Sequence, residues 1–96
     1  MAAGRPPRDY RPVIGYSIWG AGTRQDPAVL HFNLAYAESL EEALRRQLPP
    51  TVTLSIGSHG LGFDMRGVNP AMSRVDIGHV FYELARVNNW RTKHYA

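Results

Sequence analysis

Two stretches of helical periodicity divide this chain, and each of them follows two stretches in which apolar and polar residues alternate. Alternation is typical of half-buried strands, whereas apolar residues three or four positions apart are typical of amphipathic helices. The order strand, strand, helix therefore occurs twice. It predicts a single α+β domain over residues 13–88, of order ββαββα, with a four-stranded, mainly antiparallel sheet and both helices packed on one face.

The expected strands cover residues 13–19, 29–34, 51–56 and 61–66. The alternation is clearest in 51–56, where Val52, Leu54 and Ile56 fall on one side and hydroxyl residues on the other. One face of a two-layer fold has no helix over it. We expect that uncovered face to include the outward residues of the second and third strands, which are Val29, His31, Asn33, Thr51, Thr53 and Ser55.

The first helix is expected to begin at Ser39, because Ser39 and Glu42 have the spacing of a capping box. Leucines at positions 40, 44 and 48 then form one apolar stripe, and Pro49-Pro50 ends the helix. The second helix has a possible cap at Ser73 and is expected to end near Asn88.

The positive charge of this chain lies outside the expected domain. The formal net charge is +3, to which residues 1–12 contribute +2, residues 86–96 contribute +3 and residues 13–85 contribute −2. Residues 1–12, which are rich in proline and arginine, predict a flexible basic arm. Residues 89–96 predict a basic aromatic tail. The high isoelectric point thus reflects the two ends, which weakens any inference of nucleic-acid binding by a rigid basic element.

Several classes of protein are disfavoured by composition alone. The chain has no cysteine, which excludes disulfides, thiolate catalysis and cysteine-based metal sites. No apolar run is long enough for a membrane span, and residues 1–8 lack the apolar stretch of a secretory signal. We therefore expect a cytoplasmic protein without membrane contact, cofactor or metal.

Two glycine motifs resemble ligand-binding loops without their context. Residues 57–60 match the GxxG pattern of KH-type RNA-binding domains, but there the loop joins two helices and here it joins two strands. A hairpin turn is the better interpretation. Residues 20–22 lack the third glycine and the following helix of a dinucleotide-binding loop.

Catalytic arrangements are weakly indicated. Asp76, His79 and Glu83 share one face of the second helix, which is more typical of a solvated polar face than of a metal site. His59 and Asp64 could meet across the second hairpin, but a hydrolase also needs a shaped pocket and an oxyanion hole. A small hydrolase or metal enzyme using His59 or His79 therefore remains the least favoured hypothesis.

Aromatic residues beside arginines are the better candidates for a site, because tryptophan and arginine are enriched at interface hot spots. Trp19 borders a glycine-rich loop that carries Arg24, and Trp90 precedes Arg91. The alternative is that both tryptophans cover the ends of the core. The predicted partner-binding residues are Trp19, Arg24, His59, Trp90 and Arg91.

The favoured function is a non-enzymatic interaction module that binds a protein partner, as a regulator, an inhibitor, or an immunity or anti-defence protein. A second copy of the chain is an equally open partner for the uncovered sheet face. The alternative is nucleic-acid binding through the basic ends, with a steep dependence on salt. The residues expected to contact phosphates in that case are Arg5, Arg8, Arg11, Arg91 and Lys93.

Overall fold

The computed structural model describes residues 8–57 and 62–95, and it confirms the predicted α+β class. The first six elements have the expected order ββαββα, and a further strand follows them. The elements are β1 (Val13–Trp19), β2 (Val29–Asn33), α1 (Ala37–Gln47), β3 (Val52–Ile56), β4 (Gly62–Gly67), α2 (Arg74–Asn88) and β5 (Arg91–His94). Arg5 and His59, two of the candidate site residues, lie outside the described residues, as does most of the turn expected at 57–60.

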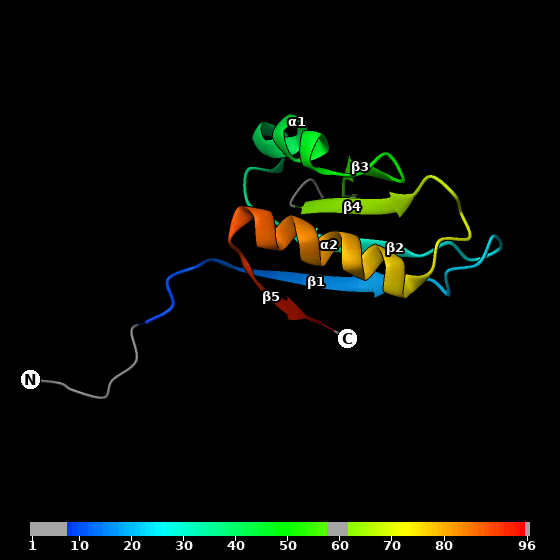
Figure 1. Cartoon of the computed structure of the whole chain (residues 1–96), viewed down its shortest axis with the longest axis horizontal. Helices are drawn as coiled ribbons and strands as arrows, with labels where there is room; N and C mark the ends of the chain where they lie inside the picture. Colours follow the sequence, from blue (N-terminus) through cyan, green and yellow to red (C-terminus); the bar gives the residue numbers. More distant parts are fainter. Residues whose placement is uncertain (1–7, 58–61, 96) are drawn as a thin grey trace, which may run out of the picture.

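The strands form one open, mostly antiparallel sheet in the order β3-β4-β2-β1-β5 (Figure 1). Each ββ pair is antiparallel, and the pairing of β4 with β2 joins the two halves of the chain into one sheet. In register, Phe32 of β2 lies opposite Phe63 of β4. The bounds of β1 to β4 agree closely with the four strands expected from the sequence.

A fifth strand is the main difference from the expected fold. β5 pairs in parallel with β1, and backbone hydrogen bonds from Arg91 N to Pro12 O (2.8 Å) and from Tyr95 N to Tyr16 O (2.7 Å) extend this pairing at both ends. The expected count of four strands is therefore one too low. All four residues of β5 are exposed, so the strand has none of the apolar alternation by which strands are recognised.

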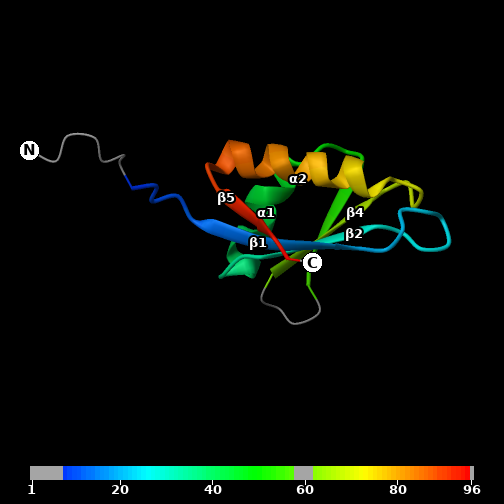
Figure 2. The same cartoon turned by 90° about the horizontal axis from the view of Figure 1, so that it is seen from below.

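Helix α2 lies over β2 and β4, on one side of the sheet (Figure 2). The predicted cap at Ser73 is confirmed, because its hydroxyl accepts a hydrogen bond from Asp76 N at 3.0 Å. Asn89 ends the helix in the left-handed conformation (φ 59°), which asparagine tolerates better than most residues. The expected end near Asn88 is also confirmed.

The N-cap of helix α1 lies three residues before the one that the sequence indicates. It is Tyr36, in the left-handed conformation (φ 61°), and the Tyr36 side chain makes no capping hydrogen bond. The predicted capping box is therefore wrong: the Ser39 hydroxyl instead donates to the Tyr36 carbonyl oxygen at 2.8 Å. The helix packs against the edge strand β3.

The hydrophobic core lies between the sheet and the helices. Three aromatic rings form its centre: Phe32 lies 5.4 Å from Phe63 and 5.0 Å from Phe81 between ring centroids. Leu54 belongs to an edge strand but is only 5 % exposed, so the core extends as far as β3. The other edge, β5, is short and carries Arg91 and Lys93, features that discourage pairing with a foreign strand.

In the part of the chain that the structure describes, no helix combines the length and the apolar character needed to cross a bilayer.

Candidate functional site

The face of the sheet that points away from the core is built from the outward residues of all five strands. Core side chains of β2 and β4 are fully buried, so the alternate residues of those strands point to the opposite side. Residues at paired positions on neighbouring strands share a side, which extends this face to β1, β3 and β5. We call it the open face, and its polar and aromatic residues are Ser17, Trp19, His31, Asn33, Thr53, Ser55, Asp64, Arg66, Arg91 and Lys93.

The centre of the open face is a polar row that crosses four strands. Ser17, His31, Asp64 and Ser55 are consecutive partners on β1, β2, β4 and β3. The His31 Nδ1 lies 2.6 Å from Asp64 Oδ1, and both side chains are about four-fifths buried, at 21 % and 17 % exposure. The other ring nitrogen, Nε2, lies 3.2 Å from the Asn33 side-chain oxygen. Contacts at both nitrogens fix the orientation of the imidazole ring.

Trp19 lies against this fixed imidazole. Its ring is nearly parallel to that of His31, with an angle of 9° and a centroid distance of 6.1 Å. The two residues are diagonal neighbours on β1 and β2, a separation that large aromatic side chains can span. Trp19 nevertheless remains 61 % exposed. The open face therefore presents a large aromatic surface that is already held in place.

The charges of the open face surround this centre. Among the described residues, Asp64 is the only acid of the open face, and it is paired with His31. Arg66 of β4 makes no side-chain hydrogen bond or ion pair within the same part of the chain. On β5, the Lys93 ammonium lies 5.2 Å from the centroid of the Tyr95 ring. The open face thus has an excess of positive charge at its periphery.

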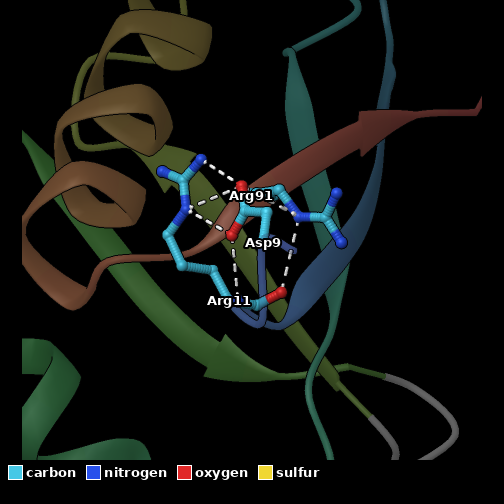
Figure 3. A network of polar contacts seen from close by, with 3 residues as sticks. All are labelled: Asp9, Arg11 and Arg91. Carbon is cyan, nitrogen blue, oxygen red and sulfur yellow. Dashed lines mark hydrogen bonds and ion pairs between the residues drawn. The ribbon is translucent and has the colours of Figure 1, made fainter. Parts of the chain in front are cut away.

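Asp9 and Arg11 of the N-terminal arm form an ion pair that lies beside Arg91 of β5 (Figure 3). Asp9 accepts hydrogen bonds from the Arg11 backbone N–H, Nε and Nη2, and Arg91 Nε lies 3.7 Å from the same carboxylate. Hydrogen bonds from Arg11 hold the pKa of Asp9 well below its ordinary value. The same contact raises the pKa of Arg11. Arg91 Nε also donates to the Arg11 carbonyl oxygen at 3.4 Å.

A small cavity of about 130 Å³ lies where this arm meets α2 and β5. Six residues line it: Arg11, Tyr82, Ala85, Arg86, Trp90 and Thr92. The guanidinium of Arg86 is bound by Glu83 through Nε (3.0 Å) and Nη2 (2.8 Å). We call this space the arginine pocket. It is separate from the open face, because its helical residues belong to the layer that covers the core.

The structure separates the two tryptophans that the sequence pattern grouped. Trp19 is on the open face, whereas Trp90 is partly buried against the core, with its ring 6.2 Å from Phe32. Arg24 is exposed in the loop between β1 and β2. Of the residues proposed for nucleic-acid contacts, Arg8 and Lys93 are exposed, while Arg11 and Arg91 share the Asp9 carboxylate.

Two acids that were considered for catalysis contact other side chains in the described residues. Asp64 contacts His31 of β2, whereas His59 was the partner considered from the sequence. On α2, Glu83 pairs with Arg86, and His79 is exposed. Within residues 8–57 and 62–95, no three histidine, aspartate or glutamate side chains are grouped so that they could hold a metal ion.

His31 was expected to point outward, but its contact with Asp64 was missed. That contact depends on the pairing of β2 with β4, and these strands are separated in the chain by α1 and β3. The alternation of apolar and polar residues indicated that His31 and Asp64 both point away from the core. It could not indicate that the two side chains meet, because that depends on β2 and β4 being neighbours in the sheet.

No protein-family model, no curated protein and no solved structure matches this chain.

Proposed function

We propose that this protein is a non-enzymatic interaction module that binds an acidic surface of a protein partner through its open face. The observation that carries the proposal is Trp19, which is 61 % exposed and yet stacked on a histidine with contacts at both nitrogens. A side chain held in place before binding loses little conformational entropy in the complex. Tryptophan is also among the residues most enriched at binding hot spots.

The distribution of polar groups supports a protein as the partner. Protein interfaces combine an aromatic centre with a charged, solvent-accessible periphery. The open face has groups of both kinds: Trp19 and Arg66 share one row of paired residues through Val29, the paired His31 and Asp64 lie in the next row, and Lys93 lies on β5.

The charge of the open face supports an acidic partner over a second copy of the same chain. Its basic residues are Arg66, Arg91 and Lys93, whereas its one acid among the described residues is Asp64. Two copies that met through this face would bring like charges together, which disfavours association. An acidic surface would instead gain from the field of Arg66 and Lys93, since Arg91 lies beside Asp9, and the gain would be largest in the rate of association at low salt.

Nucleic-acid binding is the alternative, and two carboxylates disfavour it. A phosphate backbone across the centre of the open face would approach Asp64. Along the arm, Asp9 already occupies one edge of the Arg11 guanidinium and lies beside Arg91, so fewer donors remain for the repeated phosphate contacts that a nucleic-acid backbone needs. Binding of a single-stranded oligonucleotide whose affinity falls steeply with salt, with signals moved mainly on the open face, would replace our proposal by this alternative.

The direct test compares two exposed residues with large apolar side chains. Trp19 lies on the open face, and Val75, which is 65 % exposed, lies on α2 outside the arginine pocket. Immobilised wild-type protein, Trp19→Ala and Val75→Ala would be exposed to lysate of the source organism, and captured proteins would be identified by mass spectrometry. The proposal requires an acidic protein that is retained by wild type and Val75→Ala and is lost with Trp19→Ala. Equal capture by all three proteins would contradict it.

Charge reversal then tests the chemistry of the partner. Arg66→Glu changes the open face, and Arg46→Glu makes the same change on α1, where Arg46 pairs with Glu42 at the surface. We expect the first variant to slow association with the captured partner at least about tenfold at low salt, while the second has little effect. Equal effects of the two variants would show that net charge, and not the open face, controls binding.

A role as a regulator, an inhibitor, or an immunity or anti-defence protein agrees with a module of this kind. A cytoplasmic location remains part of the proposal, since it agrees with the absence of cysteine from the sequence.

A further inference from the structure

The arginine pocket gathers cationic and hydroxyl groups from three distant parts of the chain. Arg11 comes from the arm, Tyr82 and Arg86 come from α2, and Thr92 comes from β5. None of the six lining residues carries a carboxylate. The open face uses none of these side chains, so the pocket has no role in the function proposed above.

Each arginine of the pocket has one edge of its guanidinium occupied and another available. Arg11 binds Asp9 through Nε and Nη2, and Arg86 binds Glu83 through the same two nitrogens. Among the described residues, no acceptor contacts the Nη1 group of either arginine, so each keeps both of its N–H donors there. Figure 3 shows the Arg11 guanidinium between Asp9 and α2, with its remaining nitrogen directed to the helix.

The acids that hold these arginines also orient them. A guanidinium bound along one edge is confined to a plane, and the donors on its other edge then have a fixed direction. The same contacts raise the pKa of both arginines. Glu83 and Asp9 therefore act as positioning residues outside the pocket.

From this arrangement we propose that the arginine pocket binds a terminal phosphate group, with Arg11 and Arg86 as its main ligands. Arginine pairs and clustered hydroxyl groups are the donors that phosphate oxygens favour. The volume of about 130 Å³ suits a single tetrahedral group with its point of attachment in solvent. Trp90 and Ala85 line the cavity with apolar surface, which favours the end of a phosphate ester over a continuous phosphodiester chain.

The two tryptophans of the chain make the test specific. Trp90 lines the arginine pocket, whereas Trp19 lies on the open face, so their indole N–H signals report on different sites. The signals would be assigned with Trp19→Phe. Inorganic phosphate and phenyl phosphate would then be added to the full chain in ¹H–¹⁵N NMR experiments, with sodium chloride at matched ionic strength as the control.

We expect saturable shifts of the Trp90 indole and of the Arg11 and Arg86 Nε signals, with Trp19 unchanged. Phenyl phosphate should bind more tightly than inorganic phosphate if the natural ligand is a phosphorylated side chain, and equal affinities would indicate recognition of the phosphate alone. Both of these results support the pocket. The absence of saturable shifts at Trp90, or shifts equal to those in sodium chloride, would overturn it.

Two variants test whether the measured affinity for phosphate depends on the arginine pocket. Arg86→Gln removes one proposed ligand, and Arg46→Gln removes a similarly exposed arginine of α1. We expect the first change to weaken phosphate binding roughly tenfold and the second to leave it unaltered. Because Arg86 is exposed, the variant should fold, which its dispersed NMR spectrum would verify.

Two outcomes would separate this inference from the proposed function. Equal weakening by both variants would mean that phosphate binds the surface without a defined site, which contradicts the pocket and leaves the open face untouched. A single-stranded oligonucleotide that moved the Trp90 signals more than phenyl phosphate would replace the terminal phosphate by a nucleic-acid backbone. The acidic partner of the open face is tested by the variants Trp19→Ala and Arg66→Glu, which lie outside the pocket.

Discussion

Asp9 determines how the arm meets the rest of the protein. Its carboxylate accepts from three donors of Arg11 and lies near Arg91, although Asp9 itself is exposed. Much of this contact joins residues two positions apart, so it can also form when the rest of the chain is unfolded. For that reason we expect Asp9 to order the arm and to contribute little to the stability of the domain.

The variant Asp9→Asn tests this expectation about the arm. Loss of the charge should release residues 8–11 from β5, visible as increased backbone mobility in ¹⁵N relaxation measurements, while the thermal unfolding midpoint changes little. Arg8→Gln is the control, because it changes the charge of the arm without altering the Asp9 contact. An arm as rigid in Asp9→Asn as in wild type would show that backbone pairing alone holds it.

The pH dependence of the arm follows from the same carboxylate. The pKa of Asp9 is lowered from its ordinary value of 3.8, mainly by hydrogen bonds from Arg11 of the arm itself and least by the charge of Arg91 on β5, so the charged form is favoured while these contacts are present. Such a contact is fully present above the ordinary pKa and is lost only as pH falls through the lowered one. In an NMR pH titration the arm signals should therefore still be those of the attached state at pH 3.8. Detachment centred at or above that pH would contradict the assignment.

Alanine substitutions at two glycines are expected to change the free energy of unfolding in opposite directions. Gly20 has a positive φ of 85°, and a Cβ there would lie 2.1 Å from the Pro27 carbonyl oxygen. Gly78 lies inside α2, and a methyl group added there would meet Ile18 Cδ1 at 3.7 Å, an ordinary contact. Gly20→Ala should destabilise the protein by about 1–3 kcal/mol, whereas Gly78→Ala should stabilise it by about 0.5–1 kcal/mol. Urea denaturation of both variants measures the two free energies of unfolding.

At the scale of the element, β3 shows why its edge position does not make it dispensable. Leu54 is 5 % exposed, and α1 packs against this strand. Leu54→Ala should lower the free energy of unfolding by about 2–5 kcal/mol, as for other buried leucines. Thr53→Ala on the same strand is the matched control and should cost far less, because Thr53 is exposed. A similar cost for both would mean that the core does not extend to this edge.

The elements also show which parts of the fold a sequence can predict. Strands β1 to β4 were predicted because each has a buried and an exposed side, and burial is what alternation records. β5 was missed because it joins the sheet through backbone hydrogen bonds with all of its residues exposed. The start of α1 was misplaced because Tyr36 adopts a left-handed conformation that its residue type does not suggest.

The candidate sites were less predictable than the helices and strands, because they depend on which segments meet in the folded chain. Trp19 and Trp90 were selected by residue type, and the sequence could not tell that one is exposed and the other packs near Phe32. The contact between His31 and Asp64 required the strand order. The arginine pocket required, in addition, that Arg11 and Arg86 be brought together by a strand that the sequence did not reveal.

At the scale of the whole molecule, β5 joins the two basic ends of the chain to the sheet. Truncation after Asn89 should therefore do more than remove positive charge: it also removes Trp90 from the core and uncovers the edge of β1. We expect this truncation to lower the thermal unfolding midpoint by about 10 °C or more, since loss of a partly buried tryptophan costs about 2–4 kcal/mol. The control, Arg91→Gln with Lys93→Gln, removes the same charges and should leave the midpoint nearly unchanged.

The exposed, four-residue β5 has a consequence for how the two proposed sites behave in time. An edge strand with few buried contacts is the kind of element that detaches in native-state fluctuations well below the energy of global unfolding. β5 supplies Arg91 and Lys93 to one site and Thr92 to the other. One transient fraying event would therefore remove two cations from the open face and a hydroxyl group from the arginine pocket at once, and amide hydrogen exchange of residues 91–95 would give the fraction of molecules in which both surfaces are complete.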